Sequence, residues 1–372
     1  MRSYLLTLLL ALVFFACSEK EKEITTTNIL ENLSLSIDTL LIDSKGELFS
    51  LRRGYSGQSI SDDRKFVFLY NPELSQVQQI SLETLSWEKS YDFEVEGPDG
   101  ISDVVFSVKP LENQQFLITS YQKLAIFDTS GTKIKDLSIP SLPIASDLDE
   151  LDNGVILSKN HKNLFSLPGT RFVGTRSLAK INLEKSELIT FPISELDWVL
   201  DLKVVYMGGY SYQEYIYLKD LNDQIMISSP STSSFYIFDP ISDSLTYHSF
   251  VHRLSPVNND QKLQTKVESM EAYEEEMKKF NMGVNFSGLI WDGSSKKYFR
   301  FSRKPLTMND SFGINGSQVF LYAYDQEFNL IGEKELTEIS KVPEYPFFKD
   351  GKLWSYVSVE DELGFAVFTF NF

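Results

Sequence analysis

The sequence predicts an all-β protein with one helical insertion. Its 372 residues include 28 Phe and 18 Tyr, and aromatic side chains favour strands over helices. One pattern recurs along the chain. It consists of an apolar strand, a short turn and a second strand. The dipeptides Asn153-Gly154, Asp292-Gly293 and Asp350-Gly351 add hairpin turns, because Asn or Asp followed by Gly suits the tight turn between antiparallel strands.

The recurring form is an apolar strand that ends at Asn or Asp, residues whose side chains bond the nearby backbone in turns. We find it in residues 66–71, 124–128, 178–182, 235–239, 319–325 and 365–371. After the first five, second strands are expected at residues 77–82, 133–139, 187–193, 245–251 and 330–336. Successive markers from Asn71 to Asp239 are 57, 54 and 57 residues apart. The next step is longer by a helical segment, and the period without that segment is the size of one four-stranded propeller blade.

The two ends of the chain predict how the repeats close. The last repeat stops at Phe372 without a final strand, whereas residues 33–42 form a spare strand near the N-terminus. Pairing the two would remove an exposed edge. We therefore predict a six-bladed β-propeller over residues 33–372, closed by the N-terminal strand and interrupted by a helical insertion at residues 255–283. A pair of β-sandwiches and an irregular β-solenoid are the alternatives.

The first 32 residues predict export and lipidation. Arg2 precedes an apolar run that is too short to span a bilayer and has the proportions of a secretory signal. Phe15-Ala16-Cys17-Ser18 then resembles the bacterial lipobox, so residues 1–16 read as a signal peptide and Cys17 as the lipid attachment site. Residues 17–32 are expected to be a charged tether. The prediction is a cell-envelope lipoprotein of the outer membrane, on its periplasmic side or at the cell surface; a thiol buried in an N-terminal helix is the alternative.

Charge and cysteine content exclude several classes of function. The formal net charge of −17 argues against nucleic acid as a partner, because phosphate binding needs clustered Lys and Arg. Cys17 is the only cysteine, so the domain has no disulfide and no thiolate nucleophile or thiolate metal site.

Two segments carry a resemblance to a known group of proteins. Residues 93–101 (FEVEGPDGI) and the turn at residues 126–131 (IFDTSG) resemble the six-bladed, NHL-like β-propeller lipoproteins of unknown function found in bacteria. The other repeats match that group only in outline. The resemblance implies the propeller fold and a lipoprotein, and it offers no catalytic residues to transfer.

The search for catalytic or metal-binding chemistry gives little. His248 and His252 lie on one face of a predicted strand end, but a zinc site needs a third ligand. The acidic run at residues 147–154 lacks the ligands of a calcium loop and reads as the approach to a hairpin. No phosphate-loop, dinucleotide or nucleophile-elbow motif occurs, and we predict no cofactor, no metal and no catalytic residue.

Two features predict a binding surface instead. The first is a tyrosine-rich stretch around Gly208-Gly209, in which Tyr206, Tyr210 and Tyr212 could stack on a sugar or anchor a protein. Tyr215 and Tyr217, by contrast, read as strand residues.

The second feature is the insertion, expected to be a helix capped by Asn259 or Asp260. Its apolar stripe consists of Leu263, Val267, Met270, Tyr273, Met277 and Phe280. Val267, Met270, Tyr273 and Met277 are the candidate contacts of a partner-docking arm or lid. The plainer alternative is a stripe that packs on the propeller.

The sequence thus predicts a membrane-anchored, non-catalytic β-propeller that binds a protein, peptide or glycan. One alternative is a propeller hydrolase or lyase that uses carboxylates of the central channel. Another is a structural subunit of an envelope complex.

Overall fold

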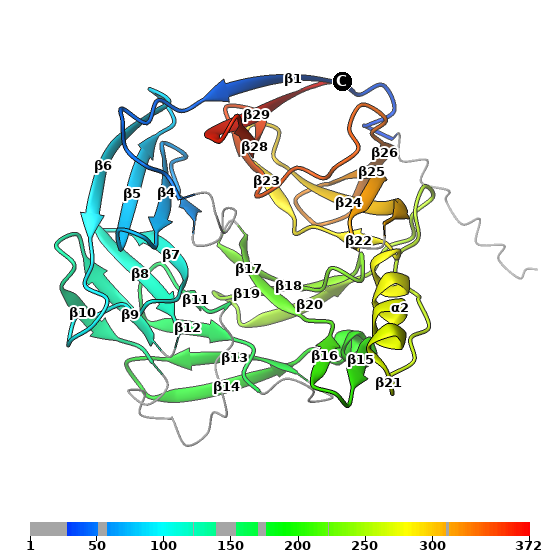
Figure 1. The fold of residues 1–372 in the computed structure, drawn as a ribbon, viewed down its shortest axis with the longest axis horizontal. Helices are drawn as coiled ribbons and strands as arrows, with labels where there is room; N and C mark the ends of the chain where they lie inside the picture. Colours follow the sequence, from blue (N-terminus) through cyan, green and yellow to red (C-terminus); the bar gives the residue numbers. More distant parts are fainter. Residues whose placement is uncertain are drawn as a thin grey trace, which may run out of the picture.

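The protein is an all-β molecule made of several small antiparallel sheets. The computed structural model describes residues 28–50, 58–121, 123–138, 154–169, 176–221, 223–309 and 312–372. Within them lie five four-stranded sheets, one five-stranded sheet and one three-stranded sheet. The larger sheets follow one another around a ring in the order of the chain (Figure 1). The expected signal peptide, Cys17, most of the tether and the acidic residues 147–153 lie outside the described part.

Six of the sheets have four or five strands each and succeed one another along the chain. The first contains β3 (Ser59–Ile60), β4 (Phe66–Asn71), β5 (Gln76–Ser81) and β6 (Ser86–Asp92). The second contains β7 (Val105–Leu111), β8 (Gln115–Ser120), β9 (Lys123–Asp128) and β10 (Lys133–Asp136). The third contains β11 (Ile156–Leu157), β12 (Asn163–Ser166), β13 (Ser177–Asn182) and β14 (Glu187–Pro192).

Three further sheets follow along the chain. The fourth contains β17 (Tyr217–Leu221), β18 (Gln224–Ser228), β19 (Phe235–Asp239) and β20 (Ser244–His248). The fifth contains β22 (Asn285–Phe286), β23 (Ile290–Asp292), β24 (Lys297–Met308), β25 (Ile314–Tyr324) and β26 (Leu330–Glu335). The sixth contains β27 (Phe347–Lys349), β28 (Lys352–Val359), β29 (Glu362–Asn371) and β1 (Ser34–Leu41).

The strand expected at residues 33–42 is present as β1 and joins the two ends of the described chain. It pairs antiparallel with β29 along its length, from Ser34 opposite Asn371 to Leu41 opposite Gly364. Leu30 and Leu33, just before β1, are buried in a cluster shared by the fifth and sixth sheets. The N-terminal segment therefore belongs to the core.

The strands that end in Asn or Asp are all present, but one takes a different place in its sheet. Each of β9, β13, β19 and β25 is followed along the chain by one further strand of its sheet, and β29 has β1 as its edge partner instead. β4, which ends at Asn71, is the second strand of its sheet, because β5 and then β6 follow it. The equal spacing from Asn71 to Asp128 therefore does not measure one repeat. The Asn or Asp predicts a hairpin turn, but it does not predict which two strands of the sheet that turn connects.

Aromatic side chains fill the spaces between neighbouring sheets. Phe68 of the first sheet lies 5.6 Å from Phe116 of the second, measured between ring centroids. Phe299 of the fifth sheet lies 5.2 Å from Phe348 of the sixth. Large rings bury much apolar surface per residue, and edge-to-face pairs add to this. Part of the Phe and Tyr content is thus used between sheets.

The insertion differs from the helix expected over most of residues 255–283. The α-helix α2 covers only Met270–Asn281. Its N-cap is Ser269, whose Oγ accepts the Ala272 N–H at 3.1 Å, and so neither Asn259 nor Asp260 caps its start. Asn259 instead lies at the other end, where its Nδ2 donates to the Phe280 carbonyl at 3.0 Å.

Contacts far along the chain explain the shorter helix. The segment before α2 runs back beside it, and the Gln264 N–H donates to the Glu276 carboxylate at 2.9 Å. The Val205 N–H donates to the Thr265 carbonyl at 2.8 Å, and β21 (Lys266–Val267) pairs parallel with β15 (Lys203–Tyr206). A Cβ built on Gly283 would lie 2.0 Å from Asn259 Oδ1, so this close approach requires glycine.

Candidate partner-binding arm

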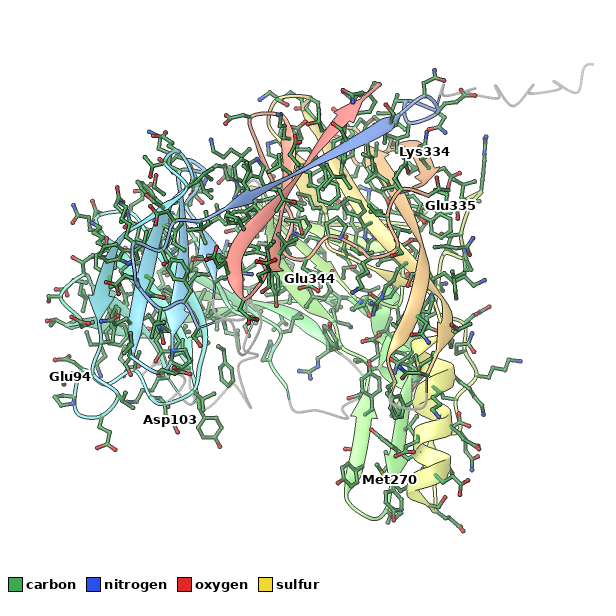
Figure 2. All side chains as sticks on the ribbon, turned by 45° about the horizontal axis from the view of Figure 1, so that its top comes forward. Glu94, Asp103, Met270, Lys334, Glu335 and Glu344 are labelled. Carbon is green, nitrogen blue, oxygen red and sulfur yellow. The ribbon has the colours of Figure 1, made fainter. Side chains whose placement is uncertain are left out.

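The two binding features of the sequence come together in one projecting unit, which we call the arm. It consists of β15 (Lys203–Tyr206), β16 (Tyr210–Gln213), β21 and α2. β15 is the central strand, antiparallel to β16 and parallel to β21. Helix α2 packs on β15 and β21, and the unit extends away from the ring of sheets with Met270 at its free end (Figure 2).

The candidate tyrosines lie on the side of the arm sheet that meets α2. Tyr206 pairs with Tyr210, and Val204 with Tyr212, so the period of two puts these side chains on one face. The Tyr210 ring centroid lies 6.3 Å from that of Tyr273, and the Tyr212 centroid lies 4.9 Å from that of Phe280. Most of this tyrosine face therefore serves to hold the helix.

The expected contact residues divide into a buried and an exposed set. Val267 is 1% exposed and belongs to the arm's own core, so it cannot touch a partner. Tyr206, Tyr212, Tyr273 and Met277 are half-buried between the sheet and the helix. Tyr210 and Met270 remain accessible at the free end.

The free end of the arm, which we call the tip, exposes three large side chains. Met207 is 80%, Tyr210 57% and Met270 37% exposed. Met207 stands in the turn between β15 and β16, and Met270 is the first residue of α2. The sequence reasoning missed Met207, although the Tyr206-Met207-Gly208-Gly209 turn beside two tyrosines was a visible signal for an exposed hydrophobic residue.

Acidic side chains surround the tip on the helix side. Glu268 and Glu271 are exposed beside Met270, and Glu275 is exposed one turn further along. Glu276 is buried instead, where Lys279 Nζ donates to it at 2.5 Å. The exposed carboxylates therefore give the apolar tip a negative border.

The base of the arm is fixed by a buried carboxylate. Glu214, directly after β16, is 2% exposed. Its Oε1 accepts the Tyr215 N–H at 2.9 Å and the Tyr212 hydroxyl at 3.3 Å, and its Oε2 accepts the Ser231 hydroxyl. Burial raises the pKa of Glu214, and these hydrogen bonds oppose the rise. The same burial, together with Glu214, raises the pKa of Tyr212.

The loop at residues 229–233, which contains the Ser231 partner of Glu214, also forms hydrogen bonds with the segment before α2 and with the fifth sheet. The Asn259 N–H donates to the Ser231 carbonyl at 2.8 Å, and the Phe286 N–H donates to the Pro230 carbonyl at 2.8 Å. Arg300 donates to the Thr232 carbonyl at 3.1 Å and also to the Ser233 carbonyl. The loop at residues 229–233 is buried and thus joins the arm to the body through several hydrogen bonds.

The described residues offer no metal centre and no membrane-spanning helix. No group of three or more His, Cys, Asp or Glu side chains gathers in the described ranges in a way that could hold a metal ion. His248 and His252 pack against Phe235 and Phe250 instead. In the same part of the chain, no helix is long and apolar enough to cross a bilayer.

Comparison with known families gives a decisive match. Residues 27–335 match the domain of unknown function DUF4221, which is more than half of the chain. The chain belongs to the DUF4221 family. A search of curated proteins finds no match.

Three solved structures are similar to this chain to different degrees. A DUF4221 member from Bacteroides vulgatus is 14% identical, with a TM-score of 0.64 over 91% of this chain and 98% of that one. At this identity the likeness shows a shared fold and nothing more. A putative exported protein from Bacteroides fragilis is 8% identical, with a TM-score of 0.49 over 92% of this chain and 96% of that chain. The extracellular domain of a putative one component system from B. thetaiotaomicron is 9% identical, with a TM-score of 0.45 over 83% of this chain and 33% of that chain.

Proposed function

We propose that this DUF4221 protein is an exported, lipid-anchored binding protein that docks a partner protein through the tip of its arm. The observation that carries the proposal is the group of three exposed hydrophobic side chains, Met207, Tyr210 and Met270, at the end of a unit that projects from the body. Large apolar side chains grouped on an exposed surface mark interaction sites, and aromatic residues and Met are enriched there.

The proposed body is a six-bladed β-propeller closed by its N-terminal strand. Support comes from the six sheets that follow one another around the ring and from the pairing of β1 with β29. Such a body needs no projecting arm, since its sheets already cover one another. The arm therefore adds a surface to the fold, and a surface of this kind is where binding is expected.

The chemistry of the tip defines the partner. Glu268, Glu271 and Glu275 border the apolar side chains, and the whole chain carries a net charge of −17. An acidic partner surface or an anionic membrane would be repelled. The partner we propose is a protein with an apolar pocket that receives Tyr210 and Met207, bordered by Lys or Arg side chains.

Cys17 is the proposed lipid attachment site that holds this protein in the cell envelope. The lipobox-like sequence at Ala16-Cys17 supports the assignment. Replacing Cys17 with Ala should move the protein from the membrane fraction to the soluble fraction in cell fractionation. Unchanged membrane retention would contradict the anchor without touching the arm proposal.

The arm is tested by quantitative cross-linking of the tagged full chain in its native cells. One variant carries Met207→Ser, Tyr210→Ser and Met270→Ser together. Its matched control is Ile241→Ser, because Ile241 is 93% exposed in the turn between β19 and β20, away from the arm. Circular dichroism and thermal unfolding establish that both variants keep the fold, and hydrogen exchange of residues 203–213 and 266–281 establishes that the tip variant keeps the arm.

We expect that wild type and the Ile241→Ser control capture one partner protein in equal amounts. The tip variant should capture much less of that protein. Its binding should weaken with added salt, since the border charges are exposed and screened. Glu268→Lys together with Glu271→Lys should also reduce capture by that protein. The arm proposal fails if wild type and the tip variant capture the same proteins in the same amounts.

A further inference from the structure

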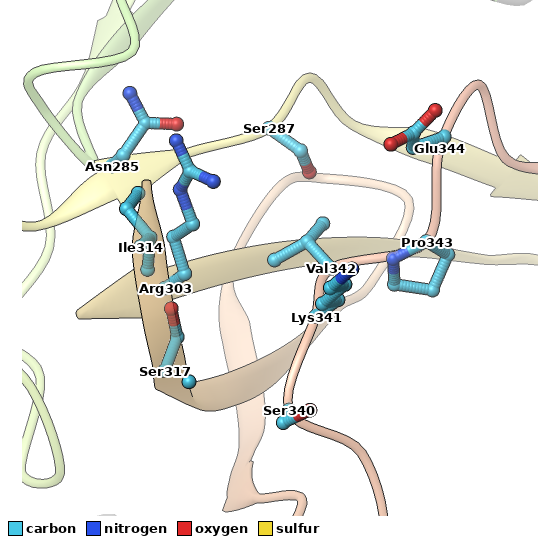
Figure 3. A pocket seen from close by; sticks show the side chains of 11 residues that line it. Asn285, Ser287, Arg303, Ile314, Ser317, Ser340, Lys341, Val342, Pro343 and Glu344 are labelled. Atoms are coloured by element: carbon cyan, nitrogen blue, oxygen red, sulfur yellow. The ribbon is translucent and has the colours of Figure 1, made fainter. Parts of the chain in front are cut away.

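A cavity of about 380 Å³ lies beside the fifth sheet. Its walls come from β22, β24, β25 and the connection at residues 340–344 that leads to β27 (Figure 3). This volume is at the small end of the range for ligand pockets. A ligand that fills it would be a small molecule.

Arg303 of β24 supplies a positive charge to this cavity. It is half-buried, and within the described residues its guanidinium forms neither a hydrogen bond nor an ion pair. Burial lowers the pKa of Arg303. A partly desolvated cation without a carboxylate partner is unfavourable, and a bound anion would relieve the cost. The fork of a guanidinium suits a carboxylate, which it can bind through two parallel hydrogen bonds.

Glu344 supplies a negative charge on another wall. Its backbone is fixed, because its carbonyl accepts the Ser355 hydroxyl at 2.9 Å and the Tyr356 N–H at 3.3 Å. The side chain points toward the cavity from the side opposite Arg303 (Figure 3). It forms no ion pair with Arg303 or with any other described residue. Glu344 is exposed, and the exposed Lys341 also lines the cavity, so charges of both signs face this space.

The remaining walls are suited to a compact organic molecule. Val342, Pro343 and Ile314 provide apolar surface in the same cavity. Asn285, which pairs with Arg303 across the strands, adds an amide whose side chain has no hydrogen bond with a described residue. The Ser287 hydroxyl is already used, since it accepts the Phe301 N–H at 3.0 Å.

We propose that this cavity binds a zwitterionic amine, a free amino acid or the backbone of a dipeptide, with its carboxylate on Arg303 and its ammonium on Glu344. The apolar walls receive the ligand's side chain. The site is independent of the arm, so the two proposals can fail separately.

The test uses the purified full chain and three related probes. L-Leucine carries both charges, 4-methylpentanoate lacks the ammonium, and 3-methylbutylamine lacks the carboxylate. The twenty L-amino acids and glycyl-L-leucine are first compared by thermal shift, and titration calorimetry then measures the best amino acid with its two truncated analogues.

The expected result is binding of at least one amino acid or of the dipeptide, with each truncated analogue about tenfold weaker or worse, as for the loss of one charge-assisted contact. Arg303→Met should weaken the zwitterion by a similar factor, and Arg303→Lys less. Glu344→Gln should weaken the zwitterion and leave the carboxylate analogue unchanged. Lys304→Met, at the exposed neighbouring position, is the matched control and should bind as wild type does.

Two results would overturn the proposal. One is the absence of binding by every probe. The other is equal binding of the zwitterion and 4-methylpentanoate together with no effect of Glu344→Gln, which would make the cavity a simple anion site. Partner capture by the arm should be unchanged in Arg303→Met, so a failure of either proposal can be told from a failure of the other.

Discussion

The ring of Tyr210 lies 6.3 Å from the ring of Tyr273, and this contact joins two segments that are far apart in the sequence. Tyr210 also stacks on Tyr206, with centroids 6.5 Å apart. The helix and the hairpin therefore share one small aromatic cluster near the tip. The cluster has few other apolar neighbours, so its loss should be felt in the arm and hardly in the body.

Tyr273→Ala should loosen the arm locally. Removal of an aromatic contact of this kind costs about 1–2 kcal/mol. Hydrogen exchange should become faster in residues 203–213 and 266–281, with the exchange of β24 and β25 unchanged. Tyr121→Ala, at a site 60% exposed outside the arm, is the control. Unchanged exchange in the arm would mean that the cluster does not hold it.

Arg300 should be among the most sensitive positions of the body. Its side chain is fully buried, donates to the Ser287 carbonyl at 2.7 Å and the Ser228 hydroxyl at 3.1 Å, and also bonds the loop at residues 229–233. The guanidinium lies 5.1 Å from the Phe286 ring centroid. It joins the fourth sheet to the fifth.

Arg300→Met should lower the free energy of unfolding by about 3–5 kcal/mol, because several buried carbonyls lose their donor. Urea unfolding followed by tryptophan fluorescence measures the change. Arg253→Met, at an exposed arginine, should stay within about 0.5 kcal/mol of wild type. Equal stability of the two variants would contradict the joining role.

Much of the β structure could be predicted from the sequence, because it depends on local signals. Apolar alternation and the Asn or Asp turns place β9, β13, β19 and β25 close to their observed bounds. The position of β4 within its sheet was not predictable in this way, because Asn71 favours a turn wherever a hairpin ends. Sheet membership depends on partners that lie far along the chain.

The arm was predictable in its parts and not in its assembly. The apolar stripe from Leu263 to Phe280 continues through residues that do not form a helix, because spacing alone cannot show that Thr265 bonds to Val205. The sequence also does not predict which residues of the stripe are exposed. Val267 fits the stripe as well as Met270 does, yet of the two only Met270 is accessible. Arg303 and Glu344 carry no sequence signal, since the fold alone brings them to one cavity.

The segment before β1 should contribute to stability as a core element. Leu33 is 2% exposed, whereas Ile37 in β1 is 44% exposed. Leu33→Ala should lower the free energy of unfolding by about 2–5 kcal/mol, since it removes buried apolar atoms and leaves a cavity. Ile37→Ala should cost much less. Urea unfolding of both variants checks this, and equal costs would place the N-terminal segment outside the core.

Lys219 should destabilise the protein at neutral pH. Its stem runs against the connection after β22, where a Cβ on Gly288 would lie 2.7 Å from Lys219 Cδ. Burial, and then Arg300 and Arg64, lower the pKa of Lys219 to about 8. The folded protein must therefore hold a desolvated ammonium below pH 8, a cost that the unfolded chain does not bear.

Lys219→Met should accordingly raise the free energy of unfolding at pH 7 by about 1–3 kcal/mol. The folded pKa lies below the unfolded value of 10.5, so the gain should be full below pH 8 and should shrink as the pH rises toward 10.5. Guanidinium unfolding at pH 7, 8.5 and 10 measures it. Lys135→Met, at an exposed lysine of β10, should change stability by less than about 0.5 kcal/mol. A loss of stability in Lys219→Met at pH 7 would show that the ammonium has a compensating partner.

His252 should make the fold sensitive to acid. Its imidazole side chain is fully buried, with its ring centroid 4.3 Å from that of Tyr322, and neither ring nitrogen has a hydrogen-bond partner in the described part of the chain. Glu333 Oε2 is 3.7 Å from Nδ1, too far for a hydrogen bond, and the Glu333 carboxylate already accepts the Arg253 N–H. Burial, assisted by Arg300, lowers the pKa of His252 to about 4.

The pH range in which His252 affects stability lies between its pKa in the folded protein and its pKa in the unfolded chain. Between pH 6.5 and about 4 the unfolded chain binds a proton at His252 that the folded protein does not bind, so the free energy of unfolding falls as the pH drops through this range. The loss from this one group amounts to about 3 kcal/mol at most. His252→Phe keeps an aromatic ring in the Phe250, Phe286 and Tyr322 cluster and removes the titration. Its urea midpoint should therefore decline less steeply than that of wild type from pH 6.5 to 4.5. Between pH 7 and 8, where His252 is neutral in both states, the difference in free energy of unfolding between the two proteins should be constant.

If the two urea midpoints instead fall in parallel from pH 6.5 to 4.5, the buried imidazole accepts a proton without unfolding.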